Sequence, residues 1–155
     1  MPVKRNELLG RLALAIRASQ NVSEAFDERV AEILGINRTD LRCLDILEQR
    51  GPMTAGQLAE AMHLSTGAVT TLLDRLERVG YARRVRDTED RRRVLVELAP
   101  EMRERSNGFY EPLFHGTVRL LEGRSDRELQ RMIEFLEQGT AMVEQELERL
   151  EQEAG

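Results

Sequence analysis

The sequence predicts a mostly helical fold with one small β-hairpin, an α+β class, and three observations carry this prediction. Two stretches with helical spacing of apolar residues, 54–62 and 65–76, are separated by a turn of two residues. Residues 81–86 and 93–98 follow and have the character of two short strands. The loop between them, 87–92, is too charged to be buried. A helix, a turn, a helix and a charged β-loop, in this order, form a winged helix–turn–helix.

Residues 7–34 have the pattern of one long amphipathic helix, with apolar side chains at every third or fourth position. A small domain cannot cover so long a stripe, so we expect part of it to contact another chain. Gly35 ends this helix. Asn37 is a suitable N-cap for the next helix, which runs to Arg50 and has Asp40 in its first turn, where the helix dipole favours an acid.

The helix over 54–62 opens with a capping box, because Thr54 is followed three positions later by Gln57. Ser65 can cap the second helix, which is the candidate recognition helix. Its apolar face is formed by Val69, Leu72, Leu73 and Leu76. The opposite face is small and hydroxylic over the first two turns. A DNA major groove admits one α-helix, whose N-terminal residues usually contact the bases.

The strand over 93–98 shows clear alternation, because Val94, Val96 and Leu98 are separated by other residues. Arg91 and Arg92 lie in the loop before it, where they could enter a narrow minor groove with concentrated negative potential. The alternative is a solvated hairpin loop without a ligand. The recognition helix beside the loop favours the DNA contact.

After the wing, Pro100 suits the first position of a helix. Pro112 lies inside this helix and predicts a bend near residues 108–112. Ser125 and Glu128 form a capping box that starts the last helix.

The last helix and the first both carry a long apolar stripe, which predicts a symmetric homodimer. The expected interface comprises Leu8, Leu12, Ile16, Leu136, Val143, Leu147 and Leu150. We therefore expect one domain over 1–155, with a DNA-binding lobe over 37–99 and dimerisation helices over 7–34 and 100–151. A two-fold dimer would place its recognition helices about 34–36 Å apart on a near-palindromic operator.

The charge is unevenly distributed. The 155 residues carry a net charge of −5, but residues 74–93 hold eight arginines and five acids, whereas the end of the chain is rich in glutamate. Phosphate contact depends on the local field, screened over about 8–10 Å, so the net charge does not exclude DNA binding. The apolar run near the N-terminus is interrupted by arginines and is neither a signal peptide nor a membrane span. A single cysteine cannot form a disulfide within the chain, which fits a reducing compartment. Together these features predict a cytoplasmic protein.

The candidate DNA-binding residues come from both helices and the wing. They are Thr54, Gln57, Ser65, Thr66, Gly67, Ala68, Thr70, Thr71, Arg75, Arg86, Asp90, Arg91 and Arg92. Arg75 has an alternative, because it could pair with Asp74 or Glu77 on its own helix; we favour the DNA contact.

The segment from Asn37 to Glu101 resembles the multiple-antibiotic-resistance regulator (MarR) family of bacterial transcription factors. The family's wing signature, Asp-x-Arg-x-x-x-Val-x-Leu-Thr, appears here as Asp90, Arg92, Val96 and Leu98, with Ala99 in place of the final Thr. Residues 67–80 resemble the family's recognition helix almost position for position, and the flanking helices extend the resemblance more weakly.

This resemblance implies a dimeric winged-helix regulator, most often a repressor of transcription. It implies that Asp90 pairs with a nearby arginine and so shapes the loop. In the family a small molecule often binds between the dimerisation helices and the DNA-binding lobe and weakens DNA binding. Candidate residues for such a pocket are Phe26, Phe109, Tyr110, Phe114 and His115, although most of them could equally be core.

Other functions find less support in the sequence. Cys43 could be an oxidation switch, but its apolar neighbours favour a buried structural residue. His63 and His115 lack the spacing of a metal site, and no catalytic constellation is present, so we expect no metal, no cofactor and no enzyme activity. The alternative function is a winged-helix protein–protein scaffold that does not bind DNA.

Overall fold

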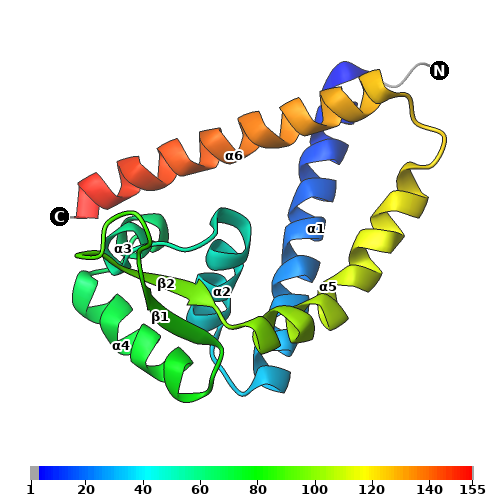
Figure 1. The fold of residues 1–155 in the computed structure, drawn as a ribbon. Coiled ribbons are helices and arrows are strands. Elements are labelled where there is room, and N and C mark those ends of the chain that lie inside the picture. Colours follow the sequence, from blue (N-terminus) through cyan, green and yellow to red (C-terminus); the bar gives the residue numbers. More distant parts are fainter. Residues whose placement is uncertain (1–3, 155) are drawn as a thin grey trace. The chain divides into compact units, whose positions relative to one another are not determined.

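The computed structural model describes residues 4–154 and contains six helices and one two-stranded antiparallel sheet among them (Figure 1). The elements are α1 (Arg5–Leu34), α2 (Arg38–Arg50), α3 (Ala55–Met62), α4 (Thr66–Arg78), β1 (Ala82–Arg86), β2 (Val94–Leu98), α5 (Pro100–Leu121) and α6 (Asp126–Ala154). The predicted fold class, mostly helical with a small wing, is confirmed. The chain divides into two compact units, one up to Tyr110 and one from Glu111 on.

The helix starts follow the capping signals of the sequence. The Asn37 side chain accepts the N–H of Asp40 at 2.9 Å, and the Thr54 hydroxyl accepts the N–H of Gln57 at 3.2 Å. Ser65 caps α4 by accepting the N–H of Ala68 at 3.3 Å. Each of these bonds satisfies an N–H that the helix itself leaves without a partner.

The turn between α3 and α4 depends on one unusual backbone conformation. His63 has a φ of 52° and ends α3 in the left-handed region, where non-glycine residues are rare. Its N–H donates to the carbonyl of Glu60 at 3.1 Å, and the next N–H, of Leu64, donates to Ala59 at 3.0 Å. These bonds end α3 sharply, so that α4 starts two residues after the turn.

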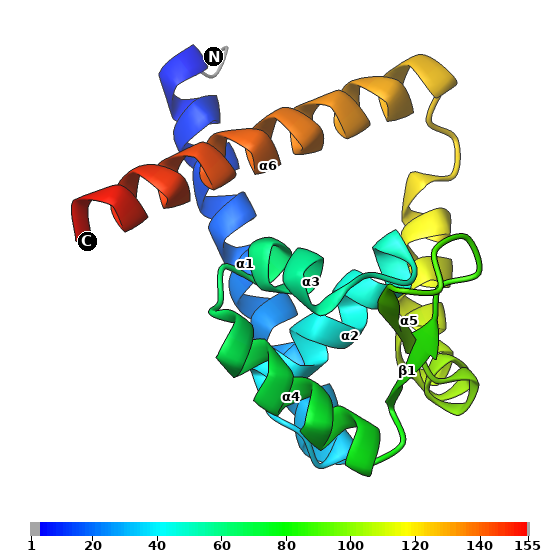
Figure 2. The same ribbon diagram turned by 60° about the vertical axis from the view of Figure 1, so that its left-hand side comes forward.

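The first unit contains the hydrophobic core, to which the end of α1, all of α2–α4, the wing and the start of α5 contribute. Figure 2 shows α2, α3 and α4 gathered together with β1 beside them. The most deeply buried side chains include Leu41, Leu47, Leu58, Leu73 and Leu76. The core therefore holds the helix–turn–helix and the hairpin together as one packed body, and the exposed face of α4 is the one opposite the core.

The wing is the hairpin formed by β1, β2 and the loop between them, and a β-bridge joins it to the segment before α3. β1 pairs with β2 from Ala82 opposite Leu98 to Arg86 opposite Val94. A bridge between Met53 and Val96 adds a third chain segment to the sheet, with N–H···O distances of 2.7 and 3.0 Å. This bridge fixes the wing to the start of the helix–turn–helix.

The second unit consists of the part of α5 from Glu111 on and α6. Most side chains along α6 are exposed within this single chain, its apolar ones included. α5 continues without interruption through Pro112, and the predicted bend near 108–112 stays a prediction. Among residues 4–154 we find no helix long and apolar enough to cross a lipid bilayer.

Candidate nucleic-acid interface

The candidate recognition helix α4 has one fully buried face and one open face. Val69, Leu72, Leu73 and Leu76 are at most 2% exposed and anchor the helix on the core. On the opposite side, Thr66, Gly67, Thr70 and Thr71 are exposed. The amphipathic pattern predicted this division, because apolar residues three and four positions apart share a face. The open face is free of bulky side chains over its first two turns.

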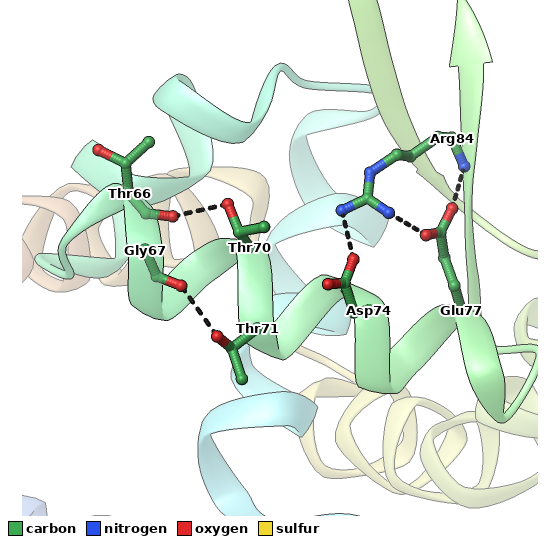
Figure 3. Close-up of polar contacts among 7 residues, drawn as sticks. All are labelled: Thr66, Gly67, Thr70, Thr71, Asp74, Glu77 and Arg84. Atoms are coloured by element: carbon green, nitrogen blue, oxygen red, sulfur yellow. Dashed lines mark hydrogen bonds and ion pairs between the residues drawn. The ribbon is translucent and has the colours of Figure 1, made fainter.

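The hydroxyls of this open face are oriented by the helix backbone. Thr70 Oγ1 donates to the carbonyl of Thr66 at 2.9 Å, and Thr71 Oγ1 donates to the carbonyl of Gly67 at 3.1 Å (Figure 3). Both oxygens keep lone pairs that can accept a hydrogen bond from a base amino group. The helix thus presents two hydroxyl acceptors in fixed orientations.

Thr54 and Gln57, the candidates from α3, hold each other in the capping box. Gln57 Oε1 accepts from the N–H of Thr54 at 2.9 Å and from its hydroxyl at 3.1 Å. Their observed role is therefore to start α3. A DNA contact by either residue stays a prediction, and the Gln57 amide N–H₂ is the group that would make it.

Arg75 has a partner that the sequence did not indicate. Its Nε donates to Asp40 Oδ2 at 2.8 Å and its Nη2 donates to Oδ1 of the same carboxylate. The hydrogen bond to Asp40 raises the pKa of Arg75. Pairing with Asp74 or Glu77, the local alternative, is wrong, and the bidentate bond holds α4 to the start of α2. The DNA contact of Arg75 stays a prediction.

Asp74 and Glu77 pair instead with Arg84 of β1. Arg84 Nη2 donates to Asp74 Oδ1 at 2.9 Å, and Nη1 donates to Glu77 Oε2 (Figure 3). The backbone N–H of Arg84 also donates to Glu77 Oε1 at 2.9 Å. In the sequence Arg84 was only one of several arginines. Its partners lie on α4, seven and ten positions earlier in the chain, and no local sequence pattern predicts a pairing over that separation.

The wing arginines are exposed, and the loop is shaped by two carboxylates. Arg86, Arg91 and Arg92 all lie at the surface. Asp90 Oδ1 accepts the backbone N–H of Arg92 at 3.0 Å, so Asp90 shapes the loop through the main chain. The ion pair of the loop joins Arg93 to the mostly buried Asp87 at 3.6 Å. The implied pairing of Asp90 with an arginine side chain is thus replaced by a backbone bond.

The aromatic candidates form two ring contacts, one in each unit. Phe26 meets Tyr110 edge to face with 5.6 Å between ring centroids, and Phe114 lies 5.8 Å from His115. Phe26, Phe109 and Tyr110 are partly buried against the core, which fits the alternative that they are core residues, whereas Phe114 is exposed.

A polar cluster adjoins the Phe26–Tyr110 pair. The Tyr110 hydroxyl donates to Asp27 Oδ1 at 3.0 Å, and Arg38 pairs with the same carboxylate at 2.9 Å. Burial and the neighbouring Asp27 raise the pKa of Asp45 to about 6. Asp27, Arg38 and Asp45 also line a cavity of about 410 Å³. The sequence did not indicate this cluster, because its members lie on three different helices and Tyr110 is 83 residues away from Asp27.

Cys43 is fully buried, as its apolar neighbours predicted. Burial and the charge of Asp40 raise the pKa of its thiol to about 12. At physiological pH it is therefore a protonated, inaccessible thiol without the reactivity of a redox sensor. Within residues 4–154 no three histidine, cysteine or acidic side chains are grouped as a metal site would require.

The fold and the open face of α4 define a winged helix–turn–helix regulator. The MarR family model matches residues 36–94. The HTH-type transcriptional regulator YcgE of Bacillus subtilis is 40% identical over 127 residues, which cover 82% of each chain. The regulator YkoM of the same organism is 32% identical over 120 residues, which cover 77% of each chain.

Solved structures show the same fold. A MarR family protein from Bacillus stearothermophilus matches 90% of this chain and 99% of its own, with a TM-score of 0.66 and 23% identity. Streptococcus pneumoniae FabT, whose structure is in complex with DNA, matches 88% of this chain and 97% of its own, with a TM-score of 0.65 and 23% identity. The chain belongs to the MarR family of transcriptional regulators, which are not enzymes.

Proposed function

We propose that this regulator is a cytoplasmic homodimer that represses transcription by binding a pseudo-palindromic operator, and that a small molecule releases it. The observation that carries the proposal is the open hydroxylic face of α4 beside the exposed arginines of the wing. This pairing suits a helix in the major groove and basic side chains in the adjacent minor groove. A scaffold without DNA binding would have no use for either surface.

Exposed apolar side chains support the dimer. Leu8, Leu12 and Ile16 of α1 are between 37 and 51% exposed within one chain, and Leu136 of α6 is 64% exposed. Val143, Leu147 and Leu150 of α6 are exposed as well. Contiguous apolar surface of this kind on a protein in water usually marks an interface. A second copy of the chain would cover these faces and give the assembly the two-fold symmetry of a palindromic site.

Repression and effector release are the finer parts of the proposal. The B. subtilis relative YetL, 31% identical over 80 residues that cover 52% of this chain and 48% of YetL, is a transcriptional repressor. The effector would contact Phe26, Phe109 and Tyr110, which are partly buried against the core of the first unit. Tyr110 is hydrogen-bonded to Asp27, which lines a cavity of about 410 Å³. This volume suits a small organic molecule, but none of the candidate pocket residues lines the cavity.

The test is fluorescence anisotropy of the purified protein on labelled DNA fragments from upstream of its own gene, across a salt series. We expect tight binding to one fragment with two chains per site and an affinity that falls steeply with salt. Candidate small molecules are then screened for release of that complex. Equally weak binding to every fragment, independent of salt, would contradict the proposal and favour the scaffold.

A further inference from the structure

Two carboxylates lie on the same face of α4 as its candidate DNA-binding hydroxyls. Thr66, Thr70, Asp74 and Glu77 follow one another at intervals of four, four and three residues, so they form one row along the helix (Figure 3). With a rise of about 1.5 Å per residue, Asp74 lies about 6 Å and Glu77 about 10 Å beyond Thr70 along the axis.

This position is unfavourable for a helix that enters a DNA groove. Repulsion between carboxylates and phosphates is screened over about 10 Å at 0.1 M salt, so both acids are close enough to act on DNA bound at Thr70. Two uncompensated negative charges in this row would oppose the binding that the hydroxylic part of the helix supports. The sequence alone therefore contains an electrostatic conflict within the recognition helix.

Arg84 is placed where it compensates both charges at once. Its Nη2 bonds Asp74 at 2.9 Å, its Nη1 bonds Glu77, and its backbone N–H bonds Glu77 at 2.9 Å. The two ends of one guanidinium thus hold the two carboxylates, a geometry that lysine cannot reproduce. The net charge of the three groups is −1, whereas the acids alone would carry −2.

The neighbouring arginine provides a contrast on the same strand. Arg83 points to the other face of the hairpin, as alternate strand residues do, and pairs with its cross-strand partner Glu97 at 2.6 Å. Arg83 and Arg84 therefore have the same charge and occupy adjacent positions, but Arg84 pairs with α4 whereas Arg83 pairs with β2.

From this geometry we infer that Arg84 is a positioning residue for DNA binding: it masks Asp74 and Glu77, so that the row headed by Thr66 and Thr70 can approach the phosphates. The inference rests on the proposed DNA-binding function and adds a residue that acts through the recognition helix, without a DNA contact of its own. The side chains in these ion pairs are between 29 and 55% exposed, so water screens them and their effect on folding is modest, whereas their effect on binding is the informative one.

The experiment compares four variants with the wild type by anisotropy on the operator fragment, at low and at high salt. They are Arg84→Gln, Asp74→Asn/Glu77→Gln, the combined triple variant, and Arg83→Gln as the matched control. Asparagine and glutamine keep an oxygen that accepts the bonds of Arg84, so the carboxamides preserve the local geometry. Circular dichroism and thermal melts establish that each variant is folded.

We expect Arg84→Gln to bind roughly tenfold more weakly at low salt, because each charge pair at this spacing repels by about the thermal energy in water. The loss shrinks at high salt, where the unmasked acids are screened. Removing the acids as well restores the affinity, so the triple variant binds at least as tightly as the wild type, whereas Arg83→Gln changes the affinity less than about twofold.

A triple variant that binds as weakly as Arg84→Gln would overturn the inference, because Arg84 would then act by touching DNA or by supporting the fold. Should Arg84→Gln fail to fold, Asp74→Asn/Glu77→Gln alone decides the matter. Masking predicts binding at least as tight as that of the wild type, whereas weaker binding would overturn it. A wild-type protein that binds none of the fragments would overturn the proposed function, and the inference with it.

Discussion

The bond between Arg75 and Asp40 yields a prediction with a magnitude that follows from burial. The side chain of Asp40 is 1% exposed, whereas that of Arg75 is 38% exposed. Removing one partner of a fully buried ion pair costs about 3–5 kcal/mol, because the other charge stays buried. Water can reach part of the gap left by Arg75, so we expect Arg75→Ala to lower the free energy of unfolding by about 2–3 kcal/mol.

Asp40→Asn should cost less, on the order of 1 kcal/mol, because the guanidinium that loses its partner is near the surface and can be hydrated. The two substitutions share one interaction, so the double variant is expected to cost less than the sum of the single variants. Arg78→Ala is the matched control: Arg78 is exposed on the same helix, and its loss should change stability by less than about 0.5 kcal/mol.

The assay is urea denaturation followed by circular dichroism at pH 7, at a single protomer concentration because dimer stability depends on concentration. If Arg75→Ala and Arg78→Ala were equally destabilising, or if the effects at Arg75 and Asp40 simply added, then the bidentate bond would not hold α4 to α2 in solution and the reasoning would be refuted.

Three further predictions concern the core and the helix starts. The pKa of Asp45 is raised to about 6, so the folded state loses stability as the pH rises through about 4 to 6. In urea titrations, Asp45→Asn should therefore stabilise the protein by about 1 kcal/mol at pH 7.5, a value that allows for the partial exposure of Asp45. At pH 4 the same substitution should change the stability by almost nothing. An equal gain at both pH values would contradict this. Cys43, whose pKa is raised to about 12, should react with iodoacetamide at pH 8 at least roughly 100-fold more slowly in the native protein than in urea, and equal rates would show that it is accessible. Ala99 precedes α5 without a capping oxygen, and Ala99→Ser should raise the free energy of unfolding by roughly 0.5–1 kcal/mol; a loss of stability would mean that the serine cannot be accommodated at this mostly buried position.

Local features of the fold could be predicted from the sequence because their causes lie within four residues. The capping box at Thr54 and the N-caps at Asn37 and Ser65 are present as predicted. The expected strands begin one residue early in comparison with β1 and β2, which is the usual uncertainty at the end of an element. Hydrophobic spacing and side-chain capping are sufficient to define this helix–turn–helix and its wing.

Long-range polar pairs could not be predicted in the same way. Asp40 had a good local explanation as an acid near a helix start, and it does serve the Asn37 cap, but its main partner Arg75 is 35 residues away. Arg84 likewise depends on the packing of β1 against α4. Composition and periodicity do not encode which arginine meets which acid, because the pairing arises only when the core brings two elements together.

The most direct test of the account is the salt dependence of operator binding by Arg91→Ala/Arg92→Ala. The matched control is Arg17→Ala/Arg29→Ala, which removes the same charge from exposed positions of α1. The account predicts weaker binding by the wing variant and a slope of log affinity against log salt that falls by about 0.9 for each phosphate that the variant no longer neutralises. The control should keep the wild-type slope. Identical slopes for the wing variant, the control and the wild type would contradict the claim that the wing binds DNA.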